Sequence, residues 1–141
     1  MCSSDLVLTD ERLRTNLSNV YAVGDIVPGL QLAHRGFLQG IFVAEEIAGL
    51  NPVTIVESGI PRATYCDPEI ASVGITEAQA KEKHGADKVE TYNYNLGGNG
   101  KSQILKTQGF VKLVRRKAGP VVGIHLVGAR VGELIGEAQL I

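Results

Sequence analysis

A glycine and a carboxylate near the start of the chain form a pair that could bind a sugar-like hydroxyl. They are Gly24 and Asp25, and they directly follow the short apolar run Val20-Tyr21-Ala22-Val23. A carboxylate at the carboxyl end of a strand can accept hydrogen bonds from a sugar or ribityl hydroxyl, and a glycine lets a ligand approach the backbone closely. Asp25 is therefore the candidate binding residue, although an aspartate that caps a loop would give the same pair.

A second candidate element is the tripeptide Leu32-Ala33-His34, which lies where a long helix is predicted to begin. The first N–H groups of a helix and the positive end of its dipole favour a group that is, or becomes, negatively charged. A reduced isoalloxazine, which carries charge near its N1 and O2 atoms, fits this requirement. At His34 we expect the backbone to matter more than the imidazole.

The two cysteines and His125 give no indication of a metal site. Cys2 and Cys66 lie far apart and form no CxxC pair, so neither a disulfide framework nor a thiolate metal site is implied. We expect Cys66 to be a buried structural thiol. His125 lies in an apolar run without a neighbouring histidine or cysteine, which predicts a core or interface residue with a hydrogen-bond partner.

The glycine-rich stretch from Asn95 to Ser102 comes close to the phosphate-binding pattern G-x-x-x-x-G-K-[ST]. Asn95 stands where the first glycine is required, and the sequence predicts no helix after the loop. We therefore expect a flexible loop between strands.

Composition excludes several classes of partner. The 141 residues are 44% hydrophobic and 21% charged, which suits a soluble globular protein. Fourteen basic residues against fifteen acidic ones give a formal charge of -1, so nothing favours nucleic acid or an anionic membrane. No apolar run approaches the roughly 20 residues that span a bilayer, and the first residues lack the pattern of a signal peptide. We expect a cytoplasmic protein.

The elements that would position the candidate residues are a strand over 20–23 and a helix over 30–49 that Gly49 closes. A polar stretch rich in helix-breaking residues follows and predicts a domain boundary near residue 58. After it we expect extended segments at 62–66 and 70–74. A capping box of Thr76 and Gln79 should open a helix that ends at Gly85.

Strands are predicted at 88–94, 110–115 and 121–127, and a helix at 131–141 with Leu134, Ile135, Ala138 and Ile141 on one side. The predicted fold class is α+β: a strand and a long helix, then a mainly antiparallel sheet with helices on one face.

Four collinear segments carry a resemblance to a known family. They are Thr-Asn-x-x-Asn-Val-Tyr-Ala-Val-Gly-Asp at 15–25, Leu-Ala-His-Arg-Gly at 32–36, Ile-Pro-Arg-Ala-Thr-Tyr at 60–65, and Pro-Glu-Ile-Ala-Ser-Val-Gly at 68–74. In this order they resemble the C-terminal part of pyridine nucleotide-disulfide oxidoreductases, from about Thr9 to Ile141. The Leu-Ala-His element and the 97–102 loop are more similar to the dihydrolipoamide dehydrogenase branch than to glutathione or mercuric reductase.

The resemblance implies a role for each candidate. Asp25 with Gly24 would bind the ribityl chain of FAD, and the backbone of Ala33, with Leu32 and His34, would face the flavin. The predicted strand and long helix would be the last strand and helix of a Rossmann-like FAD domain, and residues 59–141 would form the dimerisation domain of a homodimer. The complete enzyme would oxidise dihydrolipoamide on a lipoyl-bearing acyltransferase complex, passing electrons through a redox disulfide and FAD to NAD.

The catalytic parts of that family are not in this sequence. A CxxxxC redox disulfide and glycine-rich FAD and NAD loops would lie before Met1, and a His-Glu dyad would lie after Ile141. We therefore expect a fragment that is inactive alone. Residues 1–8 are predicted to be non-native or disordered, 9–58 to be a C-terminal piece of the FAD-binding domain, and 59–141 to be a truncated dimerisation domain. The alternatives are another disulfide reductase of the family, or a non-catalytic dimerisation module.

Overall fold

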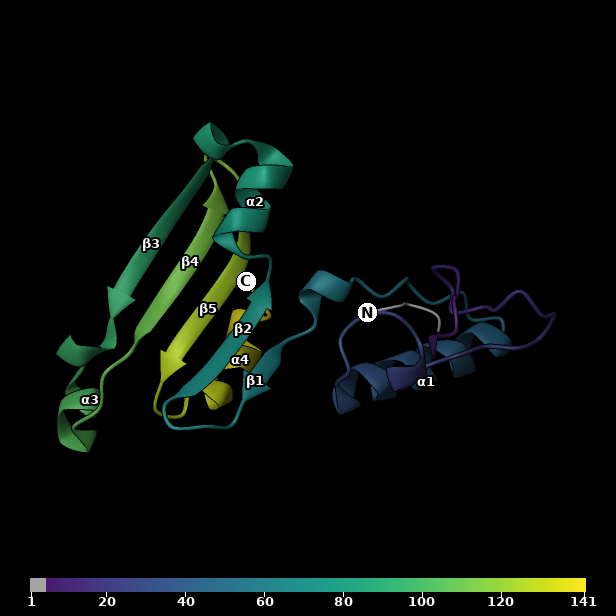
Figure 1. Ribbon diagram of the computed structural model, residues 1–141, viewed down its shortest axis with the longest axis horizontal. Helices are drawn as coiled ribbons and strands as arrows, with labels where there is room; N and C mark the ends of the chain where they lie inside the picture. The colour runs from purple at the N-terminus through teal and green to yellow at the C-terminus, as the bar shows by residue number, and fades with distance from the viewer. Residues whose placement is uncertain (1–4) are drawn as a thin grey trace. The chain divides into compact units, whose positions relative to one another are not determined.

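The computed structural model describes residues 5–141 as two compact units, one that ends at Glu57 and one that begins at Ser58 (Figure 1). The division lies in the polar stretch where the sequence places a boundary. Part of the predicted N-terminal segment, residues 1–4 with Cys2, lies outside the described residues. Farther along that segment, the Val7 amide donates a hydrogen bond to the Ile26 carbonyl at 2.8 Å.

The second unit is built on a five-stranded sheet. Its strands lie in the order β1 (Arg62–Thr64), β2 (Glu69–Gly74), β5 (Val121–Gly128), β4 (Phe110–Arg116) and β3 (Val89–Asn95). All four neighbouring pairs run antiparallel, which confirms the predicted sheet (Figure 1).

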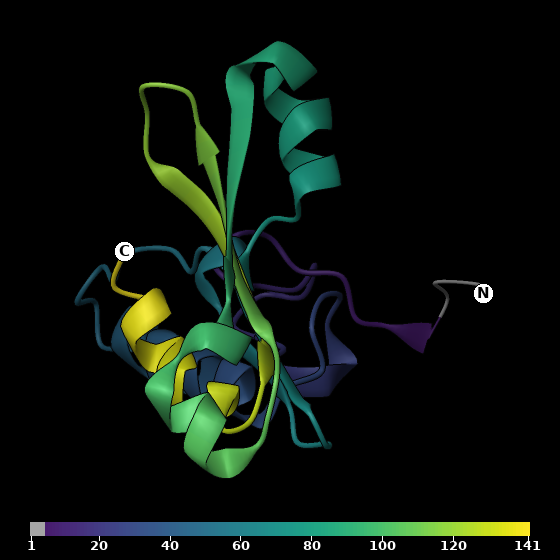
Figure 2. The same cartoon turned by 90° about the vertical axis from the view of Figure 1, so that its left-hand side faces the viewer.

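Two helices cover this sheet, and they lie on opposite faces. Successive side chains of a strand point to opposite faces. On β4, Val111 and Leu113 pack toward α4 (Val131–Ala138), whereas Lys112 and Val114 reach α2 (Glu77–His84). Figure 2 shows the two helices on either side of the strands. The prediction of helices on one face is wrong, because β4 carries apolar side chains on both of its faces.

The cluster beneath α4 is the larger of the two. Strand residues Ala71, Val73, Ile124 and Leu126 pack against Val131 and Ile135 of the helix. Ile135 therefore faces the sheet as predicted, whereas Leu134 keeps 46% of its surface exposed. The apolar spacing predicted the helix correctly, but it placed more residues on the buried side than the structure buries.

The end of β2 approaches β5 so closely that only glycine fits there. Gly74 has a φ of 81°, and a Cβ on it would lie 2.6 Å from the Gly123 Cα. A Cβ on Gly123 would in turn collide with the Ile75 carbonyl oxygen. His125 Nε2 lies 3.1 Å from that same oxygen, which confirms the predicted hydrogen-bond partner for this histidine.

Helix α2 begins and ends as predicted. Thr76 and Gln79 form the reciprocal capping box, and Gly85 follows the last residue with a φ of 95°. Glu77 in the first turn pairs with Lys112 of β4 and with Lys81 one turn later, each at 2.5 Å. Hydrogen bonds from Lys112 and then Lys81 lower the pKa of Glu77 to about 2.

The glycine-rich loop does lead into a helix, contrary to the prediction. Helix α3 (Gly100–Leu105) starts where the Asn99 side chain accepts from the Lys101 amide at 2.9 Å, and Lys106 ends it with a φ of 54°. The Asn95 side chain likewise accepts from the Gly97 amide at 2.8 Å. The loop thus uses its own asparagines to satisfy amides that a phosphate loop would offer to a ligand.

Cys66 is exposed, so the expectation of a buried thiol is wrong. It lies in the connection between β1 and β2, where its Sγ is 3.0 Å from the Pro68 carbonyl oxygen. A turn exposes its side chains to solvent whatever their polarity.

The first unit contains α1 (Ala33–Ile47) and the short 3-10 helix η2 (Gly24–Ile26). Gly49, with a φ of 74°, ends α1 as predicted. The expected strand over 20–23 does not form: Tyr21 makes one isolated bridge to Arg14. Leu13 and Asn19 both have a φ of 61°, and the segment that folds back between them pairs with 20–22 only over this single bridge.

We predict that Glu77 contributes acid-sensitive stability to the Ser58–Ile141 unit. Because its folded pKa of about 2 is below the ordinary 4.5, its stabilising effect is complete above pH 4.5 and is lost as the pH falls toward 2. Thermal unfolding followed by circular dichroism should show a shallower loss of Tm over this range in Glu77→Gln than in the unmodified chain. Glu82→Gln, on the same helix, should match the unmodified chain, and an equal slope in all three would contradict the prediction.

Candidate functional site

The Gly24–Ile26 turn packs against the first turns of α1 and carries Asp25 on its surface. Gly24 has a φ of 77°, and its carbonyl accepts from the Val27 amide at 3.2 Å, which closes the turn. A Cβ on Gly36 of α1 would lie 3.6 Å from the Gly24 Cα, so turn and helix are in close contact. The positive φ of Gly24 is a conformation that favours glycine, and the close approach of a ligand to this residue stays a prediction.

The start of α1 offers the second predicted element. Leu32 is the N-cap residue and provides no side-chain cap, while Ala33 and His34 are exposed in the first turn. Because η2 contacts α1, the structure brings both predicted elements into one unit. Among residues 5–141, no cluster of three acidic, histidine or cysteine side chains is arranged to hold a metal ion.

Two polar side chains of α1 hold the Gly24–Ile26 turn in place. Neither of them is among the residues predicted from the sequence. Gln39 Oε1 accepts from the Gly24 amide at 2.7 Å. Arg35 donates from Nη2 to the Pro28 carbonyl at 2.6 Å and from Nη1 to the Gly24 carbonyl at 3.4 Å. The available signal was their spacing: they lie four residues apart and share with Phe42 the buried side of α1.

Arg35 is 3% exposed and therefore needs a counter-charge. Glu57 provides it through two hydrogen bonds of 2.9 Å to the Arg35 Nε atom. A buried guanidinium with a single carboxylate partner is costly to disrupt, so this pair fixes Arg35 and, through it, the 24–28 loop.

A cleft of about 350 Å³ lies beside this pair, lined in part by Asp10, Glu11, Arg35 and Gln39. None of the predicted site residues lines it. Its acidic side chains would repel a phosphate or carboxylate, so the cleft and the predicted flavin edge are different places.

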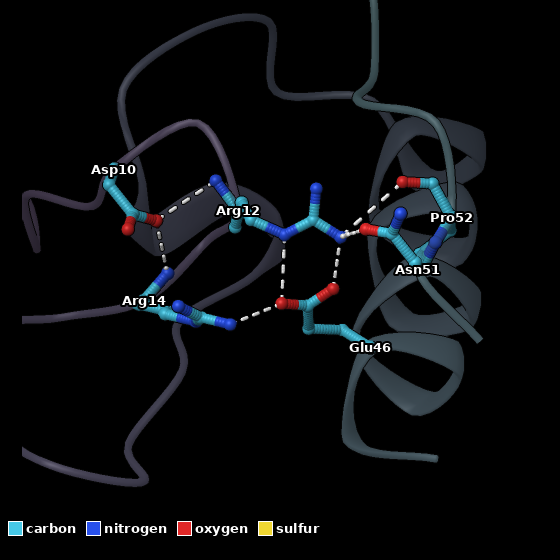
Figure 3. Close-up of polar contacts among 6 residues, drawn as sticks. All are labelled: Asp10, Arg12, Arg14, Glu46, Asn51 and Pro52. Carbon is cyan, nitrogen blue, oxygen red and sulfur yellow. Dashed lines mark hydrogen bonds and ion pairs between the residues drawn. The ribbon is translucent and has the colours of Figure 1, made fainter. Parts of the chain in front are cut away.

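A second polar cluster joins the start of the unit to the end of α1 (Figure 3). Glu46 accepts from Arg12 Nε at 2.8 Å and also pairs with the Nη2 atoms of Arg12 and Arg14. The Asp10 carboxylate accepts from the amides of Arg12 and Arg14, each at 2.9 Å. The hydrogen bond from Arg12 is the largest cause that lowers the pKa of Glu46, and the same bond raises the pKa of Arg12.

Comparison with known proteins decides the family. Residues 60–141, more than half of the chain, match the family described as "Pyridine nucleotide-disulphide oxidoreductase, dimerisation domain". The chain belongs to this family. This confirms the resemblance found in the sequence.

Relatives within the family extend the match to both units. The dihydrolipoyl dehydrogenase of Bacillus subtilis is 44% identical over 142 residues, covering 99% of this chain and 30% of the relative. That of Corynebacterium glutamicum is 42% identical over 134 residues, covering 93% of this chain and 29% of the relative. The crystal structure of LpdA from Mycobacterium tuberculosis superposes with a TM-score of 0.86 at 27% identity, over 96% of this chain and 29% of that one. The chain thus spans about 30% of the length of these oxidoreductases.

We predict that Glu46 fastens residues 10–14 to α1. Glu46→Gln should remove the charge that both arginines share, so the amides of residues 12–14 should exchange with solvent deuterium several-fold faster. Mass spectrometry of exchanged peptides would measure this. Glu45→Gln alters the neighbouring carboxylate and should leave these amides unchanged, whereas equal exchange in both variants would argue against the anchor.

Proposed function

We propose that this chain supplies one edge of the flavin site and the subunit-pairing domain of a dihydrolipoyl dehydrogenase. The observation that carries the proposal is the 44% identity to such an enzyme across 99% of the chain, which includes both units. The complete enzyme would oxidise dihydrolipoamide on a lipoyl-bearing acyltransferase complex and reduce NAD. Its expected cytoplasmic location stays a prediction.

The residues of the first unit fit part of an FAD molecule. The exposed Asp25 carboxylate can accept hydrogen bonds from ribityl hydroxyls. A Cβ on Gly24 would meet no atom within 4 Å, so the surface above the turn is open to a ligand. The first amides of α1, beyond the uncapped Leu32, suit the negative charge of a reduced flavin. When bound, FAD would relay electrons between the redox disulfide and NAD.

Catalysis by the chain alone is not expected. The sequence contains two cysteines, Cys2 and Cys66, so it has no CxxxxC pair for disulfide exchange. We therefore propose that NADH-linked lipoamide reduction requires the parts that the relatives have and this sequence does not contain.

For the second unit we propose pairing with a second copy. On β3, Tyr92 and Tyr94 lie opposite Leu113 and Val111 of β4, and so they share the α4 face of the sheet. They are 52% and 57% exposed, and they stand on an edge strand. Exposed tyrosines beside an apolar face are typical of interface residues. This unit has its own core, which also supports the alternative of a non-catalytic dimerisation module.

We predict that FAD contacts the Asp25 turn directly. In the ¹⁵N-labelled chain, titration with FAD should shift the amide resonances of residues 24–26 and 33–35. Asp25→Asn removes the charged acceptor and should weaken the apparent affinity about tenfold, as expected for a hydrogen bond to a carboxylate. Glu11→Gln, which removes a carboxylate from the acidic cleft, should have no effect. Shifts confined to the cleft, or none at all, would rule out the proposed flavin edge.

We predict that the 15.0 kDa chain sediments as a dimer through the α4 face. A Tyr92→Lys and Tyr94→Lys double variant places charge on that face and should shift sedimentation toward the monomer. Asn93→Lys adds charge to the same strand on the other face and should stay dimeric. Dissociation by Asn93→Lys, or none by the double variant, would place the interface elsewhere.

A further inference from the structure

We propose that Gln39 is a positioning residue for Asp25, and that its side-chain oxygen is the atom that performs this task. The role rests on the proposed function, because it concerns the turn from which Asp25 would reach the flavin. Gln39 lies outside the motif Leu-Ala-His-Arg-Gly at 32–36, which contributes to the family resemblance.

Hydrogen bonds hold both the amide and the carbonyl of Gly24. Gln39 Oε1 accepts from the Gly24 amide at 2.7 Å, directly before Asp25. The Gly24 carbonyl accepts from the Val27 amide at 3.2 Å and lies 3.4 Å from Arg35 Nη1. Of these contacts, the one from Gln39 is the shortest, and it fixes the amide side of the turn to the middle of α1.

This contact matters because the turn has an uncommon backbone conformation. Gly24 has a φ of 77° in the left-handed region, where glycine is free to move to other conformations. The amide contact therefore selects one of several accessible turns. That selection sets the direction in which the next residue, Asp25, leaves the backbone.

The two ends of the Gln39 amide are unequal. Its side chain is 1% exposed, and within residues 5–141 its Nε2 atom has no hydrogen-bond partner, while Oε1 has the Gly24 amide. A buried polar side chain that served packing alone would be replaceable by an apolar one of similar size. Because only Oε1 has a partner, we expect the side-chain oxygen to hold the turn and the NH₂ group to be dispensable.

This inequality predicts opposite outcomes for two substitutions. Gln39→Glu keeps an acceptor toward Gly24 and removes the unpartnered donor, and its charge would lie one helical turn from the buried Arg35. Gln39→Leu keeps a similar volume and removes the acceptor. Phe42→Leu is the matched control, because Phe42 is buried on the same side of α1, 3% exposed, without a polar contact to Gly24.

The test measures the Gly24 amide in the ¹⁵N-labelled chain at neutral pH, by its proton chemical shift and its hydrogen exchange rate. Gln39→Leu should move the shift and speed the exchange at least about tenfold, as expected for one lost hydrogen bond. Gln39→Glu should keep the exchange slow. Phe42→Leu should lower the Tm while leaving the Gly24 resonance in place. If Gln39 had a merely structural role, Gln39→Leu would give this same pattern.

The same samples are then titrated with FAD, with Asp25→Asn as reference. The inference predicts that Gln39→Leu weakens the response of residues 24–26 as Asp25→Asn does, and that Gln39→Glu preserves it. Unchanged Gly24 exchange in Gln39→Leu, an equal effect of Phe42→Leu, or a Gln39→Glu variant that behaves like Gln39→Leu would overturn it. If the exchange data come out as predicted while Asp25→Asn leaves the FAD response intact, the flavin role of Asp25 fails and the hold of Gln39 on the turn stands.

Discussion

The alternation of side chains along the central strands is the constraint on which the Ser58–Ile141 unit depends. β4 and β5 each contribute to both faces, so the cluster under α4 and the cluster under α2 share the same backbone. Gly74 and Gly123 allow the chain to leave β2 and reach α2 without separating β5 from its neighbour. The ion pair between Glu77 and Lys112 then ties α2 to β4. A change in register at this point would move apolar side chains to the wrong helix on both faces at once.

The unit that ends at Glu57 depends on a different kind of contact. Its buried apolar residues are small or scattered, and the side of α1 that faces the loops carries Arg35 and Gln39 beside Phe42. The guanidinium of Arg35 and the side-chain oxygen of Gln39 are paired, and each of their partners is a backbone or side-chain group of the loops. Directional bonds of this kind hold loops at defined angles better than apolar packing does. Such an arrangement suits a surface that presents backbone and one carboxylate to a ligand.

The two units have different proposed roles, and each role follows from the structure of the unit. The Ser58–Ile141 unit has a core of its own and exposed tyrosines on an edge strand, which suit the proposed pairing surface. The helical unit offers Asp25, an open glycine turn and a helix start, which is one side of a cofactor site. The relatives are about three times as long as this chain, so the proposed roles of its two units concern only part of such an enzyme.

Features encoded within a few neighbouring residues were predictable from the sequence by itself. The alternation along β4, the capping box at Thr76, the helix end at Gly49 and the collinear family motifs are all of this kind. Tertiary structure decided the rest. It placed α2 and α4 on opposite faces, gave 20–23 one isolated bridge in place of a strand, and aimed Gln39 at the Gly24 amide. The physical reason is that a ladder, a covered face or a buried hydrogen bond needs a second segment, and local pattern does not say which segment will be there.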